Sequence, residues 1–184
     1  EESLRRLAVD CVDLYQIHWY NRSVPISETM RAMEELVDAG MVKYIGVSNF
    51  STKDMKEAQA VMNKYPIVSN QVLYNLNSRR IEQELLPYCQ QNRVTVIAFT
   101  PLDSGSLGSS PRFRPARRSQ ALDQLANELG KTRAQVALNW CVSRPNVIAI
   151  PKSDSLSRTV ENCGASGWHL TDEQVRMLDE AYAN

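Results

Sequence analysis

The sequence lacks the features that direct a protein to a membrane or to nucleic acid. Lysine plus arginine and aspartate plus glutamate both number 21, so the net charge is zero and attracts neither nucleic acid nor an anionic bilayer. No apolar run approaches the roughly 20 residues that a membrane-spanning helix needs, and no stretch resembles a secretory signal. We therefore predict a cytoplasmic protein with neither nucleic acid nor a membrane as its partner.

Cysteine and histidine are also scarce. The four cysteines include no CxxC pair and have no histidine at ligand spacing, which argues against a disulfide framework or a zinc site. The two histidines are His18 and His169, and His169 falls after the last predicted strand, next to a helix start. A metal-dependent barrel hydrolase is therefore disfavoured, and we expect no metal site.

The chain does contain a regular alternation of short apolar strands and amphipathic helices. Five strands are predicted, over Cys11–His18, Tyr44–Ser48, Ile67–Leu73, Val94–Thr100 and Asn146–Ile150. Helices are predicted over Ser27–Ala39, Ser51–Asn63, Ile81–Gln91, Gln120–Leu129, Thr132–Ser143, Ser155–Asn162 and Thr171–Tyr182. Asp103–Ser119, rich in glycine, serine, proline and arginine, is predicted to be a long loop.

Several residues mark helix ends. Ser27 is expected to cap the first predicted helix, and Gly40 stands where a helix-ending glycine belongs. Thr132 with Gln135, and a second threonine at position 171 with the glutamine three residues later, form the pattern of a capping box.

Strands that alternate with helices predict an α/β fold with a parallel sheet. The absence of GxGxxG after the first strand argues against a Rossmann-type fold, which leaves a parallel barrel or an open doubly wound sheet. We expect residues 1–184 to form one domain. Because the sequence starts without Met and with apolar Leu4, Leu7 and Val9, we interpret it as a piece of a longer polypeptide.

Every predicted strand is followed by polar or aromatic residues. In parallel βα folds, ligands bind beyond the carboxyl ends of the strands. The residues at these ends are His18-Trp19, Ser48-Asn49, Gln71 with Tyr74-Asn75, Thr100-Pro101 and Pro151-Lys152-Ser153. All five ends can therefore hold a ligand.

The same segments resemble the consecutive strand-end motifs of aldo-keto reductases. They read DLYQIHW, KYIGVSNF, NQVLYN, VIAFTPL and IPKS-x4-R-x2-EN, in the order and spacing of that family across the whole chain. The resemblance implies a (β/α)8 barrel of the TIM type, of which this chain supplies roughly the last five βα units. It also implies reduction of a small-molecule carbonyl compound by NADPH.

The resemblance assigns His18 and Trp19 to the substrate. His18 would donate a hydrogen bond to the carbonyl oxygen that gains negative charge as hydride arrives, and Trp19 would line the substrate pocket. The alternatives are a core histidine that ties two strand ends together and a packing aromatic.

The resemblance assigns two further groups of residues to the nicotinamide half of the cofactor. Ser48, Asn49 and Gln71 would bind the carboxamide, although Ser48-Asn49 also fits a helix cap. Phe99 stands where many family members have a tyrosine stacked on the ring, so the hydroxyl is missing here. Thr100, Leu102 and Ser104 would follow the pyrophosphate, and the loop 103–119 would either cover it or be a solvated, disordered segment.

The last motif favours NADP over NAD. Lys152, Ser153 and Arg158 can gather around a 2′-phosphate, and the resemblance places Glu161 and Asn162 near the adenine. The simpler interpretation is an ordinary ion pair between Arg158 and Glu161, three residues apart on one helix.

The family mechanism also needs a tyrosine, a lysine and an aspartate from earlier strand ends, and no residue of this sequence matches them. We therefore expect a missing N-terminal half of the barrel to supply these three groups and the 184 residues alone to be inactive. The alternative is a cofactor-binding module or regulatory subunit without turnover.

Overall fold

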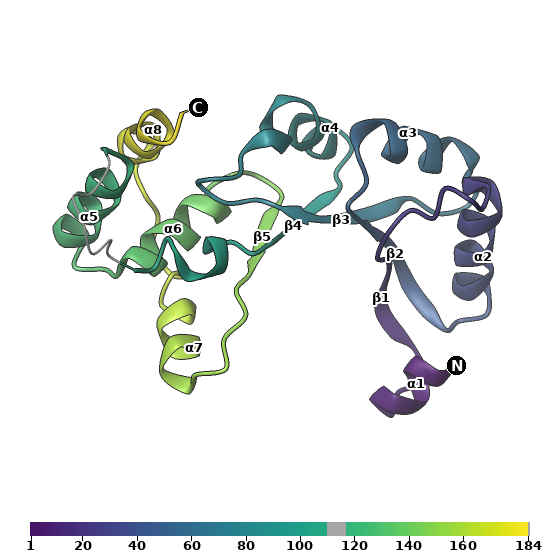
Figure 1. The fold of residues 1–184 in the computed structure, drawn as a ribbon. Coiled ribbons are helices and arrows are strands. Elements are labelled where there is room, and N and C mark those ends of the chain that lie inside the picture. The colour runs from purple at the N-terminus through teal and green to yellow at the C-terminus, as the bar shows by residue number, and fades with distance from the viewer. Residues whose placement is uncertain (110–116, 184) are drawn as a thin grey trace. The chain divides into compact units, whose positions relative to one another are not determined.

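The computed structural model describes residues 1–109 and 117–183. It contains a five-stranded sheet, and Figure 1 shows the strands together with the helices that accompany them. The strands follow one another in the sheet in chain order, and β1 pairs with β2 and β2 with β3 in parallel. The predicted parallel α/β sheet is confirmed, and strand ends differ from prediction by two residues at most. The strands are β1 Val12–Ile17, β2 Val42–Ser48, β3 Ile67–Leu73, β4 Thr95–Phe99 and β5 Val147–Ile150.

The helices of the described residues are α1 Glu2–Leu7, α2 Ile26–Asp38, α3 Thr52–Val61, α4 Leu85–Gln91, α5 Arg117–Leu129, α6 Arg133–Val142, α7 Leu156–Cys163 and α8 Asp172–Ala181. Two short 3-10 helices, η1 Arg80–Gln83 and η2 Asp103–Gly105, complete the set. Both predicted capping boxes, at the starts of α6 and α8, are confirmed. Gly40 has φ 70° and ends α2 as predicted, with its N–H donating to the carbonyl of Val37.

Two helix predictions were wrong. Ser27 does not cap α2, because the helix begins at Ile26 after Pro25 and Ser27 lies in its first turn. The predicted helix 81–91 is divided into η1 and α4. In a continuous helix, the ring of Pro87 would clash with the backbone carbonyl four residues earlier. Because α4 starts at Leu85, Pro87 lies in its first turn, where the backbone N–H has no helical partner in any case.

The predicted loop 103–119 was wrong at its C-terminal end, because α5 begins at Arg117. Its first residues form the short turn η2, in which Asp103, Ser104 and Gly105 all have positive φ. Residues 110–116, in the middle of that loop, lie outside the described residues.

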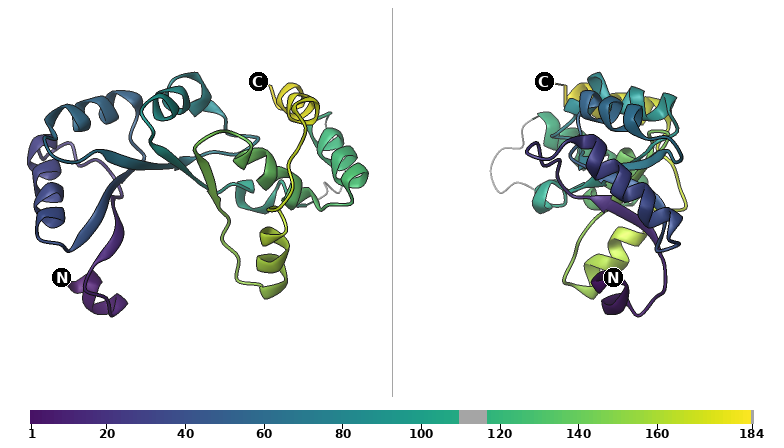
Figure 2. Two further views of the ribbon diagram at one scale, coloured as in Figure 1. Left: turned by 180° about the vertical axis from the view of Figure 1, so that it is seen from behind. Right: turned by 90° about the vertical axis from the view of Figure 1, so that its right-hand side faces the viewer.

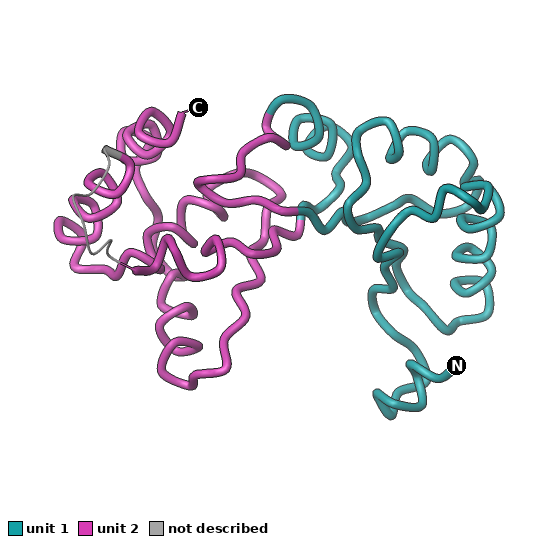
Figure 3. The backbone as a smooth tube through the Cα atoms, viewed as in Figure 1, with its two compact units in different colours: residues 1–72, 83–96 teal, residues 73–82, 97–184 magenta. Residues whose placement is uncertain are grey.

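The chain consists of two compact units (Figure 3). Unit 1 comprises Glu1–Val72 and Gln83–Val96, and unit 2 comprises Leu73–Glu82 and Ile97–Asn184. The single domain expected from the sequence stays a prediction.

In unit 1, helices cover one face of the sheet. Helix α2 packs on β2 and on α3, and the side chains between them, such as Met30, Ile45 and Met55, are almost fully buried. On the opposite face, Leu14 and Tyr44 keep 36% and 56% of their surface exposed. The helix-covered face is therefore the core of this unit, and the other face is available to further contacts.

A buried carboxylate joins α2 to the segment before β3. Glu34 is buried and accepts hydrogen bonds from the backbone N–H groups of Lys64, Asn63 and Tyr65 at 2.7, 3.0 and 3.3 Å. The bond from Lys64 is the largest cause of a lowered Glu34 pKa, and it outweighs the opposing effect of burial. Glu34 thus stays ionised, and its carboxylate is the hydrogen-bond acceptor for the backbone N–H groups of this turn.

In unit 2, the side chain of Trp140 on α6 is fully buried. The guanidinium groups of Arg79 and Arg144 lie 5.2 and 5.1 Å from its ring centre, and its indole N–H donates to Asp179 of α8 at 2.9 Å. Helices α5 and α8 lie side by side (Figure 2). These contacts join Arg79, just before η1, to α6 and α8.

Candidate active site

The three strand ends of unit 1 are joined by side-chain hydrogen bonds. The Asn49 side-chain N–H donates to the carbonyl of His18 at 3.2 Å and to Ser48 Oγ at 3.0 Å, and Ser48 Oγ donates to the carbonyl of Gln71 at 2.9 Å. Asn49 has φ 61°, in the left-handed region that asparagine tolerates better than most residues. The structure therefore brings together four of the predicted residues, and Trp19 follows them with 65% of its surface exposed.

The helix-cap alternative for Ser48 and Asn49 does not hold. Helix α3 is capped by Ser51, whose side chain accepts from the N–H of Asp54 while the Asp54 carboxylate accepts from the N–H of Ser51. Ser48 and Asn49 lie before this cap, and their side chains bind the backbone carbonyls of Gln71 and His18 at the strand ends.

The loop after His18 is fixed by Arg22. Its guanidinium donates to the Asp54 carboxylate at 2.9 Å and lies 4.7 Å from the centre of the Tyr20 ring. The Tyr20 ring in turn stacks on Phe50, with ring centres 5.6 Å apart. The ion pair between Arg22 and Asp54 thus ties the segment after Trp19 to the first turn of α3.

The Asp54 carboxyl has a lowered pKa. Burial acts first and raises it, but hydrogen bonds from the Ser51 side chain and backbone and from Arg22 outweigh the burial. A carboxyl whose pKa is lower in the folded state stabilises the fold above its unfolded pKa, and this contribution is lost as the pH falls through the folded pKa.

We expect Asp54→Asn to lower the free energy of unfolding at neutral pH by about 1 to 2 kcal/mol, the usual effect of losing a helix-capping interaction. The difference from the unsubstituted protein should stay constant down to about pH 5 and shrink below about pH 4, where Asp54 itself takes up a proton. Urea unfolding at several pH values measures this. A difference that grows as the pH falls would contradict the assignment.

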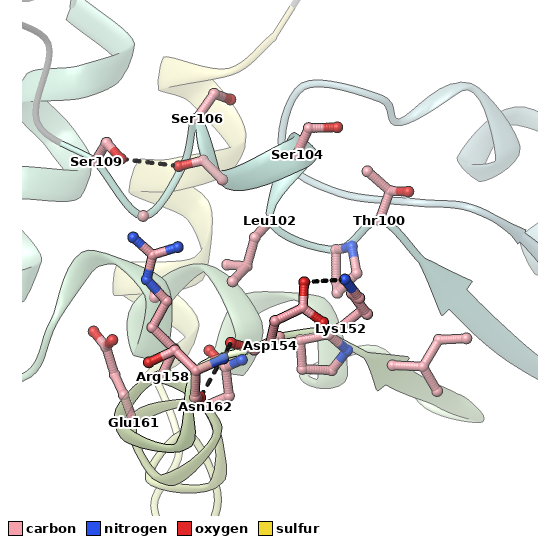
Figure 4. Close-up of a pocket in the computed structure, with 18 residues that line it drawn as sticks. Thr100, Leu102, Ser104, Ser106, Ser109, Lys152, Asp154, Arg158, Glu161 and Asn162 are labelled. Carbon is pink, nitrogen blue, oxygen red and sulfur yellow. Dashed lines mark hydrogen bonds and ion pairs between the residues drawn. The ribbon is translucent and has the colours of Figure 1, made fainter.

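Unit 2 contains a pocket of about 820 Å³ beyond the ends of β4 and β5 (Figure 4). Residues predicted from two motifs that are distant in the sequence, VIAFTPL and IPKS-x4-R-x2-EN, line the same pocket. They are Thr100, Leu102, Ser104, Lys152, Ser153, Arg158, Glu161 and Asn162. All but Ser153 are labelled in Figure 4. Phe99 ends β4 but does not line this pocket.

Thr100 has an unusual backbone. Its φ of 51° lies in the left-handed region, which a β-branched residue adopts only at a cost in energy. The side chain of Asn75, itself fully buried, donates to the carbonyl of Thr100 at 2.9 Å and holds it there. Strained backbone conformations are concentrated at ligand sites. Here, the strained residue Thr100 is the first residue of the turn that contains Leu102 and Ser104.

The pocket contains both acidic and basic side chains. Lys152 pairs with Asp154, and both side chains are largely exposed. Arg158 extends from α7 toward the segment of Ser106 and Ser109 (Figure 4). Within the part of the chain that the structure describes, Arg158 forms no ion pair with Glu161, so the simple helix-pair interpretation is wrong. The guanidinium is therefore available to an anion.

Some pocket residues were not predicted from the sequence. Asp154 is the clearest, because it directly follows IPKS and lies between Ser153 and Arg158, two residues assigned to the phosphate. A negative charge next to Lys152 was the signal for it. In unit 1, Gln16 was also missed, although it is a polar residue near the end of strand β1 and not exposed.

A sequence model of the family described as Aldo/keto reductase matches residues 1–183. The chain belongs to this family. Within the described residues, no helix of this aldo/keto reductase chain is both long and apolar enough to cross a bilayer.

Three relatives illustrate the match. Methylglyoxal reductase YeaE of Escherichia coli K12 is 38% identical over 183 residues, which are 99% of this chain and 62% of that protein. An aldo/keto reductase of Klebsiella pneumoniae, solved in complex with NADP and acetate, is 39% identical with a TM-score of 0.84 over 98% of this chain and 62% of its own. Glycerol dehydrogenase AKR11B4 of Gluconobacter oxydans is 30% identical with a TM-score of 0.89 over 99% of this chain and 62% of its own. The chain thus spans about three fifths of the length of these relatives.

Proposed function

We propose that the full-length protein reduces aldehydes or ketones to alcohols with NADPH. We also propose that residues 1–184 are the last five βα units of a (β/α)8 barrel and form one domain with the rest of that barrel. The observation that carries this proposal is the pocket of unit 2, where two separate motifs bring Lys152 and Arg158 together with Thr100. The solved complex of the Klebsiella pneumoniae relative with NADP supports the same cofactor.

The residues present fit NADP(H) in size and chemistry. A pocket of about 820 Å³ has the size of ordinary cofactor sites, and an arginine and a lysine that line the same pocket can bind phosphate groups. Lys152, Ser153 and Arg158 would hold the 2′-phosphate, while Glu161 and Asn162 would contact the adenine. Thr100, Leu102 and Ser104 would follow the pyrophosphate.

The remaining residues would hold and orient the nicotinamide. Ser48, Asn49 and Gln71 would bind its carboxamide, and the phenyl ring of Phe99 would stack on the ring. When bound, the cofactor supplies a hydride to the carbonyl carbon of the substrate. The three polar residues thus select which face of the ring is presented.

His18 would act on the substrate. Its imidazole would donate a hydrogen bond to the carbonyl oxygen and stabilise the negative charge that develops there. Asn49 restrains the backbone of His18 by donating to its carbonyl, and Trp19 would line the substrate pocket. The proton that completes the alcohol would come from a tyrosine, helped by a lysine and an aspartate, outside residues 1–184.

The segment 103–119 is proposed to cover the cofactor. Ser104, Ser106 and Ser109 at its start line the pocket, and residues 110–116 lie outside the described part. The cytoplasmic location predicted from the sequence stays a prediction.

The alternative is a cofactor-binding module or regulatory subunit without turnover. Oxidation of NADPH by the full-length protein, followed by its absorbance with a series of small aldehydes including methylglyoxal, separates the two. Turnover supports the reductase. Tight NADPH binding without turnover of any aldehyde or ketone would instead favour the binding module.

The pair between Lys152 and Asp154 leads to a prediction about cofactor preference. We expect Asp154→Asn to increase NADPH affinity by about two- to fivefold, because it removes a negative charge and leaves Lys152 unpaired; exposed ion pairs are worth about 0.2 to 1 kcal/mol. NADH affinity should change less, since NADH has no 2′-phosphate. Fluorescence titration measures both, with the exposed Glu180→Gln as control. An equal gain for NADH would contradict a contact with the 2′-phosphate.

A further inference from the structure

Three residues form one row across the first three strands. Gln16 of β1 pairs in register with Gly46 of β2, and Gly46 pairs with Ser69 of β3. The Gln16 side chain extends along this row, because its N–H group donates to the carbonyl of Val47 at 3.1 Å and to Ser69 Oγ at 3.4 Å. A side chain from β1 thus reaches the third strand.

Gly46 makes this path possible. A Cβ atom at position 46 would lie 2.3 Å from Ser69 Oγ and 2.9 Å from Gln16 Cγ, closer than real contacts allow. Gln71, the residue proposed to bind the carboxamide, lies two positions after Ser69 on β3 and pairs in register with Ser48. Gly46 therefore leaves room for Gln16 to approach Gln71 across β2.

Gln16 contacts the amide of Gln71 directly. The Gln71 side-chain N–H donates to Gln16 Oε1 at 3.2 Å. Since the amide nitrogen of Gln16 faces Val47 and Ser69, its oxygen is the atom turned toward Gln71. This favours the Gln71 orientation whose nitrogen points to Gln16, and it leaves Gln71 Oε1 as an acceptor for another group.

We propose that Gln16 is a positioning residue that fixes the amide orientation of Gln71. This inference rests on the proposed function, in which Gln71 binds the nicotinamide carboxamide. A carboxamide N–H needs an acceptor, and the orientation set by Gln16 offers Gln71 Oε1. Without Gln16, the amide of Gln71 can rotate by half a turn and present a donor instead, so that fewer molecules are ready to bind the ring.

Gln16→Met, Gln71→Met and the double variant test this in the full-length protein. Each is titrated with NADPH and with adenosine 2′,5′-bisphosphate, which has the 2′-phosphate but no nicotinamide. We expect each single variant to weaken NADPH by about 3- to 10-fold, the effect of one hydrogen bond. Binding of the bisphosphate should not change, and the double variant should be no weaker than Gln71→Met. Gln120→Met, at an exposed position, is the control.

Four outcomes would overturn the inference. If Gln71→Met weakens NADPH and Gln16→Met does not, the inference fails while the proposed function stands. If Gln16→Met weakens both ligands alike, or if the two losses add in the double variant, Gln16 does not act through Gln71. If Gln71→Met itself leaves NADPH binding unchanged, the proposed carboxamide contact fails first.

A second variant covers the case in which Gln16→Met does not fold. Gln16→Glu keeps an oxygen that can accept from Gln71 but removes the donor to Val47 and Ser69. We expect Gln16→Glu to bind NADPH more tightly than Gln16→Met does. If Gln16→Met is insoluble, the NADPH affinity of Gln16→Glu should lie within about threefold of that of the unsubstituted protein. A loss of tenfold or more, with the bisphosphate unaffected, would contradict an acceptor role for Gln16.

Discussion

His18→Ala is expected to lower kcat by about 100-fold or more, while the affinity for NADPH stays close to that of the unsubstituted protein. The reason is that a hydrogen bond to the carbonyl oxygen strengthens as charge develops, so its loss raises the barrier of the chemical step and not the energy of the bound cofactor. Removing a single such donor costs about 10²–10³ in kcat in other enzymes.

Steady-state kinetics of the full-length protein, together with an NADPH titration, test this expectation. The matched control is His169→Ala, at the other histidine of the chain, whose side chain is exposed in unit 2. The control should retain the kcat of the unsubstituted protein. An unchanged kcat in His18→Ala would refute the assigned role. A large loss of NADPH affinity would instead place His18 at the cofactor.

Arg158→Met is expected to weaken NADPH by about 10- to 100-fold and to change NADH binding little. A hydrogen bond to a charged group contributes about 1.5–3 kcal/mol, and methionine keeps much of the length of arginine while removing its charge. The guanidinium makes no ion pair with Glu161 in the described structure, so the loss would be in ligand binding and not in stability of α7.

Titrations with NADPH, NADH and adenosine 2′,5′-bisphosphate measure the expected discrimination. Arg176→Met is the control, because Arg176 is an exposed arginine of the same unit on α8. If NADPH and NADH weaken alike in Arg158→Met, the assignment to the 2′-phosphate is wrong. If Arg158→Met lowers the melting temperature strongly, Arg158 has a structural role that the contacts around α7 do not show.

Much of the fold follows from local patterns. The strands β1 to β5 are short apolar runs bounded by turn residues, and the sequence predicts each within two residues. The helix starts at Thr132 and Thr171 also follow from the sequence, because a capping box forms between residues only three positions apart. Where a competing local signal was overlooked, as at Pro25 and Pro87, the predicted helix boundaries were wrong.

The composition of the pocket in unit 2 was predictable for the same reason. Thr100 and Lys152 each follow a strand, and the carboxyl ends of parallel strands share one edge of a sheet. The strained conformation of Thr100 was not predictable, because the group that holds it is the side chain of Asn75, which is distant in the chain. The pairing of Lys152 with Asp154 was also missed, although the two residues are only two positions apart and the acidic residue was visible in the sequence.

The sequence by itself determined the alternation of strands and helices, the family and the residues that stand at the strand ends. Tertiary structure alone decided which polar side chains meet on the sheet. Ile45 pairs with Ile67 but Gly46 pairs with Ser69, so β3 carries one extra residue, and this irregularity aligns Ser69 with Gly46. Gln16 and Gln71 are 55 positions apart, yet they form a hydrogen bond. Such contacts depend on the register between strands, which is set when the whole sheet packs and not by the neighbours of each residue in the chain.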